Sequence, residues 1–180
     1  MSKKLILLDA YALIYRAHFA FIKNPRINSK GLNTSAIFGF CNSLLEVTNK
    51  FDPSHIGVVF DPPGGSDREG VFADYKANRQ EMPEDIRKAI PYIFDLLKAM
   101  NIKVEMEEGF EADDVIGTLA KQAEKKGFET YMMTPDKDFG QLVSDHIFIY
   151  KPGRSGNPSE ILGPKEVCEK FEVKDPLQVI

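Results

Sequence analysis

Short apolar runs alternate with segments of helical spacing along most of this chain. Apolar residues that recur every three or four positions predict three amphipathic helices after the first apolar run. Strands and helices follow one another in turn, which favours right-handed crossovers and a parallel sheet covered on both faces. The expected fold class is therefore α/β, with a mainly parallel central sheet flanked by helices. The expected strands are residues 4–8, 56–60, 102–106, 130–133 and 147–150, and the expected helix faces are Ile37, Cys41, Leu44 and Leu45, then Ile86, Ile90, Ile93, Phe94 and Leu97, then Val115, Ile116, Leu119, Ala120 and Ala123.

Length and composition predict one globular domain across residues 1–180. Of the 180 residues, 43% are hydrophobic and 28% are charged, so the chain can bury a substantial core. One composition break interrupts the pattern between Asp61 and Pro83, where Pro, Gly and charged residues predominate. Such a segment is typical of an exposed, mobile excursion from a domain, not of a linker between two domains.

The first residues and the cysteines indicate a cytoplasmic protein. The amino terminus has a basic start and an apolar run, but Asp9, Arg16 and His18 interrupt that run too early for a signal peptide or a membrane span. Cys41 and Cys168 are far apart and lack the spacing of metal ligands, which fits a reducing compartment.

Seven acidic residues lie just after four of the expected strands. The carboxyl ends of parallel strands meet at one edge of a sheet, where open α/β sheets bind their ligands. Each acid alone also fits a helix cap or a turn, as Asp9 does before Tyr11 and Asp61 does before Pro62. Independent caps need not all follow strands, so the joint placement favours one site. The seven are Asp9, Asp61, Glu111, Asp113, Asp114, Asp136 and Asp138.

The stretch "GFEADDVIG" places Glu111, Asp113 and Asp114 within four consecutive positions, more acid than a helix cap needs. Crowded carboxylates repel, and the usual relief is a raised pKa or a bound cation. Oxygen ligands without His or Cys point to Mg²⁺ or Mn²⁺. A site with room for two ions about 3.5 to 4 Å apart suits phosphodiester hydrolysis, because the ions activate water and stabilise the leaving oxygen.

The formal charge of −4 includes those seven acids, and the rest of the chain would carry +3 without them. Within the excursion, Lys76 and Arg79 are three positions apart, and Phe72 and Tyr75 are aromatic neighbours. If the segment is helical, the two cations share one face, where they could hold a phosphate while an aromatic ring stacks on a base. A solvated, charged helix is the alternative interpretation of this segment.

Six stretches, in this order and spacing, resemble one family. They are "LLDAYALIYRAHFA", "SAIFGF", "VVFD", "YKANR", "EADDVIGTLA" and "TPDKDFGQLVSD". The combination is similar to the amino-terminal 5′ nuclease domain of bacterial DNA polymerase I, within the flap endonuclease and PIN-like superfamily. The resemblance runs over nearly the whole chain, from about Lys3 onward, and it is far more specific than any single motif.

This resemblance implies a PIN-like, resolvase-like fold and a divalent-metal-dependent 5′ nuclease. Its substrate would be DNA with a 5′ flap, nick or single-stranded end, cleaved during primer removal and repair. Lys76 and Arg79 would hold the scissile phosphate, Tyr75 would stack on a base, and Arg16 would lie beside the site. The seven acids would bind Mg²⁺ or Mn²⁺ directly or through water.

The resemblance also predicts that the chain is a fragment. It stops at Ile180, before the segment in which this family carries a further pair of metal-binding aspartates and a helix-hairpin-helix motif. We therefore expect an incomplete second metal site, weakened duplex binding, incomplete activity, and polymerase domains in the full-length protein.

Two other classes of function remain open on the sequence. A DNA-binding module could keep the fold without turnover. A toprim-like or phosphatase-like phosphotransfer domain could use the acids of "TPDKD", although the nucleophile and lysine patterns of such families are not evident. Cleavage of a 5′ flap, or release of phosphate from small esters, would separate the three.

Overall fold

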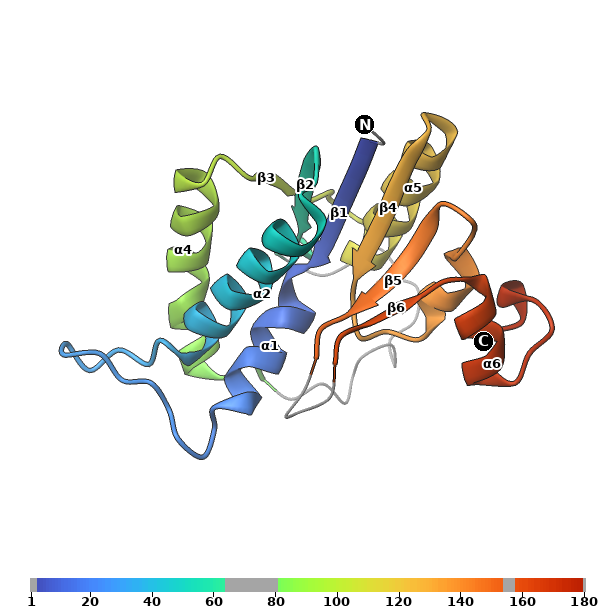
Figure 1. Ribbon diagram of the computed structural model, residues 1–180. Helices are drawn as coiled ribbons and strands as arrows, with labels where there is room; N and C mark the ends of the chain where they lie inside the picture. Colours follow the sequence, from blue (N-terminus) through green and yellow to red (C-terminus); the bar gives the residue numbers. More distant parts are fainter. Residues whose placement is uncertain (1–2, 64–80, 154–157, 180) are drawn as a thin grey trace.

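One twisted sheet organises the molecule, and five of its six strands are parallel (Figure 1). The computed structural model describes residues 3–63, 81–153 and 158–179. The strand order is β3-β2-β1-β4-β5-β6, so the first strand lies near the centre, and only β6 is antiparallel to its neighbour. The strands are β1 (Lys3–Asp9), β2 (His55–Val59), β3 (Lys103–Glu105), β4 (Phe128–Met133), β5 (Ile147–Lys151) and β6 (Glu160–Leu162).

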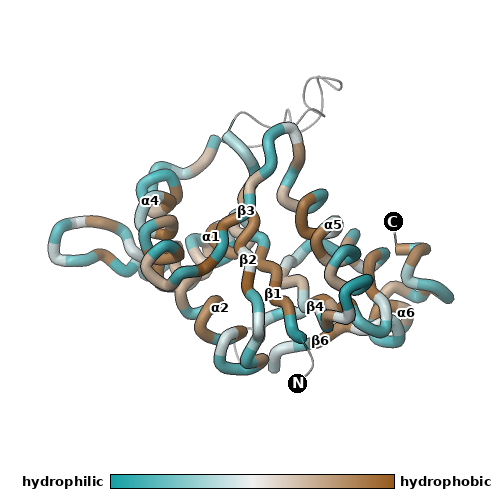
Figure 2. The backbone as a smooth tube through the Cα atoms, turned by 90° about the horizontal axis from the view of Figure 1, so that it is seen from above, coloured by the Kyte–Doolittle hydropathy of each residue, from teal (hydrophilic) through white to brown (hydrophobic). Residues whose placement is uncertain are grey.

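Helices cover both faces of this sheet. In Figure 2, α1, α2 and α4 lie on one side of the largely hydrophobic strands, and α5 and α6 lie on the other. The α-helices are α1 (Ala10–Ala20), α2 (Ser35–Phe51), α4 (Glu84–Ala99), α5 (Ala112–Lys125) and α6 (Pro164–Phe171), and two 3₁₀ turns, η1 (Asp138–Leu142) and η2 (Pro176–Gln178), follow β4 and α6.

The central strand shows why both layers are stable. Ile6 and Leu8 are fully buried against the core under α1, α2 and α4, whereas Leu7 is buried in the core under α5. Successive side chains of a strand point to opposite faces, so a strand covered on both faces is apolar at consecutive positions. The run "LILL" therefore forms a strand buried on both sides, as its sequence predicts.

All five expected strands are present and the expected fold class is confirmed. The sixth strand, β6, was not expected, because three residues are too few to show a period. It reverses direction after β5 and pairs Tyr150 with Ile161. One helix face also needs correction: Leu45 is 42% exposed, whereas Leu44 is buried. Neighbouring residues of a helix point about 100° apart, and the buried stripe of α2 runs through Phe40, Leu44 and Val47.

No helix in the part of the chain that the structure describes is long and apolar enough to cross a membrane. The middle of the expected excursion at residues 61–83, with Tyr75, Lys76 and Arg79, lies outside the described residues.

Candidate active site at the strand ends

Asp9 ends β1 and begins α1. Its backbone is extended, and one carboxylate oxygen accepts a hydrogen bond from the Ala12 N–H at 3.1 Å, the bond of a helix N-cap. The other oxygen accepts a hydrogen bond from the Thr134 hydroxyl at 3.3 Å. Thr134 follows β4 and is buried, so two strand ends hold this carboxylate in place.

Asp61 connects the end of β2 to the start of α5. Its carboxylate accepts a hydrogen bond from the Ala112 N–H at 2.7 Å, across 51 residues of sequence. The backbone before it is also held, because the Phe60 N–H donates to the Glu105 carbonyl at 3.0 Å. The sequence offered a local turn at Pro62 as the structural explanation, but the partner of Asp61 belongs to another element.

The three acids of the α5 amino terminus differ in their surroundings. Glu111 is the N-cap residue and is only 6% exposed. Asp114 accepts a hydrogen bond from the Glu111 N–H at 3.3 Å, which is a capping contact. Asp113 makes no hydrogen bond within the described ranges and faces other carboxylates instead. Glu111 and Asp114 therefore belong to the helix cap, and Asp113 is left to the site.

Asp136 and Asp138 follow β4 in a short loop. The Asp138 N–H donates to the Asp136 carboxylate at 2.9 Å, and the Asp136 N–H donates to the Thr134 hydroxyl oxygen at 3.2 Å. This turn leads into η1, whose first residue is Asp138. Asp136 is half-buried and Asp138 is exposed, so Asp136 is the member of the pair that is turned toward the other acids.

Electrostatic repulsion shows which acids the fold brings together. Burial, together with the charges of Asp9, Asp136, Asp61 and Glu111, raises the pKa of Asp113 to about 7. Burial likewise raises the pKa of Asp9; the hydrogen bonds from Ala12 and Thr134 oppose this rise, and the charges of Asp61 and Asp136 add to it. Five carboxylates from four strand ends thus lie within electrostatic reach of one another.

The donor set fits a hard divalent cation that keeps much of its water. Among residues 3–63, 81–153 and 158–179, no three His, Cys, Asp or Glu side chains converge closely enough to cage one ion. This arrangement still suits Mg²⁺, because that ion binds one or two carboxylates directly and retains several waters. The remaining acids can then act through those waters.

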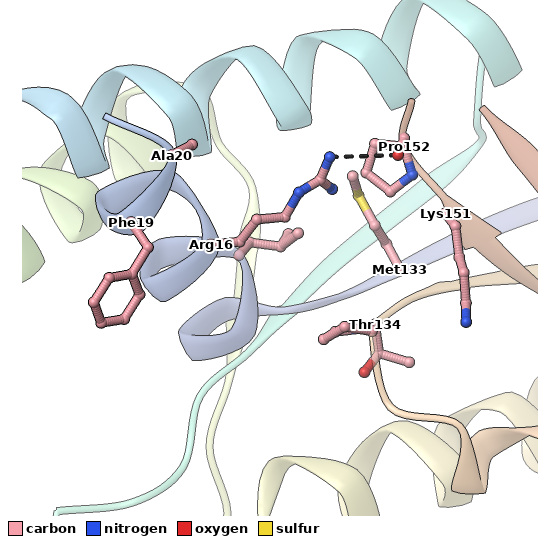
Figure 3. Close-up of a pocket in the computed structure, with 9 residues that line it drawn as sticks. Arg16, Phe19, Ala20, Met133, Thr134, Lys151 and Pro152 are labelled. Carbon is pink, nitrogen blue, oxygen red and sulfur yellow. Dashed lines mark hydrogen bonds between the residues drawn. The ribbon is translucent and has the colours of Figure 1, made fainter. Parts of the chain in front are cut away.

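Arg16 lies near Thr134, and its role toward DNA stays a prediction. Its guanidinium donates to the Pro152 and Gly153 carbonyls at 3.3 and 3.1 Å and lines a cavity with Thr134 and Lys151 (Figure 3). Sequence reasoning missed Thr134 and Lys151. Thr134 sits between a strand and "PDKD", where a buried hydroxyl could have been suspected, whereas no local pattern marks Lys151.

Residues 4–172 match the family described as "5'-3' exonuclease, N-terminal resolvase-like domain". The chain belongs to this 5′-3′ exonuclease family. The resemblance drawn from the six sequence stretches is therefore confirmed.

Among curated relatives, DNA polymerase I of Bacillus subtilis is 39% identical over 179 residues, which are 99% of this chain and 20% of the relative. The 5′-3′ exonuclease of Aquifex aeolicus is 38% identical over 172 residues, 96% of this chain and 57% of that protein. The chain thus spans about a fifth of the polymerase and little more than half of the shorter nuclease.

Solved structures share the fold at low sequence identity. The T5 5′-exonuclease with bound zinc ions aligns with a TM-score of 0.71 at 16% identity, over 97% of this chain and 63% of that one. The T5 flap endonuclease in a pseudo-enzyme-product complex with DNA and metal ions gives 0.70 at 17% identity, over 97% and 62%. This 5′-3′ exonuclease domain therefore has the 5′ nuclease fold that the sequence predicted.

Proposed function

We propose that this 5′-3′ exonuclease domain hydrolyses phosphodiester bonds at 5′ ends or flaps of DNA, with Mg²⁺ or Mn²⁺, during primer removal and repair in the cytoplasm. The observation that carries the proposal is the group of five mutually repelling carboxylates at the strand ends. Polymerase I relatives about five times as long support polymerase domains in the same full-length chain. In this proposal residues 1–180 are one nuclease core, with an arch over residues 61–83.

The proposed metal ligands act directly or through water. Bound divalent ions would activate the attacking water and stabilise the leaving oxygen. The chain's own contribution is to hold the acids: the Ala112 N–H orients Asp61, and the Thr134 hydroxyl orients Asp9. Family membership supports a divalent-metal site, and the number of ions, proposed as two, rests on the resemblance. The proposed ligands are Asp9, Asp61, Glu111, Asp113, Asp114, Asp136 and Asp138.

Contacts to DNA are proposed for four further residues. Lys76 and Arg79 would bind the scissile phosphate and Tyr75 would stack on an unpaired base, as in the family resemblance. Arg16, held by two backbone carbonyls beside Thr134, would contact the backbone of the same strand.

The test is cleavage of a labelled 5′ flap by the full-length polypeptide that carries this domain. Mg²⁺ or Mn²⁺ should support cleavage and EDTA should stop it, and Asp113→Asn should slow it at least about a hundredfold. Asp145→Asn is the matched control, because Asp145 is exposed just before β5, at the opposite end of the sheet.

Other outcomes would replace the proposal. Binding of flap DNA without metal-dependent cleavage would indicate a DNA-binding module. Release of phosphate from small esters, with intact flap DNA, would indicate a phosphotransfer domain. Equal rates for Asp113→Asn and its parent would remove the carboxylates from the mechanism.

A further inference from the structure

A cavity of about 430 Å³ opens beside the carboxylates. It lies between α1 on one side and the ends of β4 and β5 on the other (Figure 3). Its volume falls within the range of small-molecule sites, about 300 to 1,000 Å³. Leu13, Phe19 and Met133 contribute apolar surface, and Arg16, Thr134 and Lys151 contribute polar groups.

Lys151 supplies a positive charge to this cavity. It is half-buried at the end of β5, and it makes no hydrogen bond or ion pair within the described ranges. Burial lowers the pKa of its ammonium and the nearby Lys170 lowers it further, although Glu160 and Asp136 oppose that effect. A partly desolvated cation of this kind gains from an anionic ligand, because charge-assisted hydrogen bonds replace its lost water.

The opposite wall suits a flat or apolar group. Phe19 is 53% exposed at the end of α1 and lines the cavity, while Leu13 and Met133 are buried beneath it. The guanidinium of Arg16 is fixed by its two bonds to the carbonyls of Pro152 and Gly153. The cavity therefore combines a cationic corner with an apolar wall, each already in place.

Thr134 connects this cavity to the carboxylates. It lines the cavity and donates to Asp9 at 3.3 Å, so a ligand in the cavity lies next to the proposed cleavage site. We propose that the cavity binds a nucleoside 5′-monophosphate unit, with its phosphate on Lys151 and its nucleoside against Phe19. This inference rests on the proposed function, because the unit is either a nucleotide of the DNA strand beside the cleaved bond or the released product.

Metal-free binding tests the cavity independently of cleavage. The probes are thymidine 5′-monophosphate, thymidine and inorganic phosphate, titrated in EDTA while the methyl NMR signal of Met133 is followed. The monophosphate should shift the signal and bind more tightly than either part alone. Lys151→Met should weaken binding of the monophosphate about tenfold and leave the affinity for thymidine unchanged. Lys165→Met, which removes an exposed lysine of α6, is the charge-matched control.

A second variant tests the apolar wall without changing charge. Ala20 is exposed at the end of α1 and lines the cavity, so Ala20→Leu fills space and leaves the fold intact. It should weaken the monophosphate and thymidine alike, and leave inorganic phosphate unaffected. Together, Lys151→Met and Ala20→Leu assign the two halves of the ligand to the two walls.

The two sources of the unit give different results. A 5′-phosphorylated oligothymidylate that shifts the Met133 signal and displaces the monophosphate identifies the DNA strand, and a shift by the monophosphate alone identifies the product. No shift with either probe, equal binding of inorganic phosphate, or unchanged affinity in Lys151→Met would overturn the proposal. Binding in EDTA together with absent flap cleavage would sink the nuclease proposal and leave the cavity assignment standing.

Discussion

Two groups of acids in this molecule have pKa values shifted in opposite directions. On the surface, Glu84 and Glu160 pair with Lys88 and Lys170 at 2.9 Å, and these lysines lower the pKa of each glutamate. At the strand ends, burial and neighbouring carboxylates raise the pKa of Asp113. Surface acids thus pair with lysines, whereas the strand-end acid Asp113 faces other carboxylates.

The fold accepts an energetic cost at the strand ends and not at its surface. Exposed ion pairs contribute little to stability, because water already solvates both charges. Concentrating half-buried carboxylates destabilises the folded state until a cation or a proton neutralises them. Such unrelieved repulsion at one edge of a well-packed sheet is typical of a functional site.

The largest expected effect is stabilisation by metal. A cation that binds only the folded state at a hundred times its Kd adds about 2.7 kcal/mol, or about 5 to 10 °C in Tm for a chain of this size. Millimolar Mn²⁺ or Mg²⁺ should therefore raise the midpoint of thermal unfolding, and Asp113→Asn should reduce that shift. If metal leaves the unfolding midpoint of both the parent and Asp113→Asn unchanged, the strand-end acids do not bind metal and the distinction between the two groups of acids fails.

The pH dependence of the metal-free protein is the next effect. The pKa of Asp113 is about 7 in the folded state and near its ordinary 3.8 in the unfolded state. Between these values the folded state holds the extra proton, so stability falls as pH rises from about 4 to about 7. Asp113→Asn should remove about 1 to 2 kcal/mol of this fall, after allowance for solvent screening at a half-exposed group.

Urea unfolding in EDTA at several pH values measures that fall. The variant should be the more stable of the two proteins above pH 7 and lose its advantage toward pH 4. Parallel stability curves for Asp113→Asn and its parent would show that the pKa of Asp113 is not raised in the folded state.

A smaller effect is expected from the hydroxyl that orients Asp9. Thr134→Val keeps the shape of the side chain but removes its hydrogen bond to the Asp9 carboxylate. The affinity for Mn²⁺, measured by calorimetry, should fall about tenfold. Thr130→Val is the matched control, because the Thr130 hydroxyl is buried and has no hydrogen-bond partner in the described part of the chain. Equal losses in both variants would mean that Thr134 serves packing alone.

The smallest effect is expected on the surface. Glu84→Gln breaks the ion pair with Lys88, but both side chains are largely exposed. Its Tm should stay within the error of the measurement, at low and at high salt. A clear drop would show that the paired acids contribute more than this comparison assigns to them.

Prediction from sequence worked best where the signal is local. The expected strands at residues 4–8 and 130–133 are short, mainly apolar runs that can be recognised without the rest of the chain. Both are confirmed. The acids after them could be placed at one edge because parallel strands share their direction. Their role as metal ligands, like the roles of Lys76 and Arg79, stays a prediction.

The sequence alone determined the α/β class, the family and the position of each acid relative to a strand, because periodicity and motif spacing are properties of neighbouring residues. Only the tertiary structure decided which acids face one another. Asp61 meets Ala112 across 51 residues, and Thr134 meets Asp9 across 125, because the strand order β3-β2-β1-β4 places those strand ends side by side. The same order creates the cavity of Lys151, since its two walls come from segments that are neighbours only after the sheet has formed.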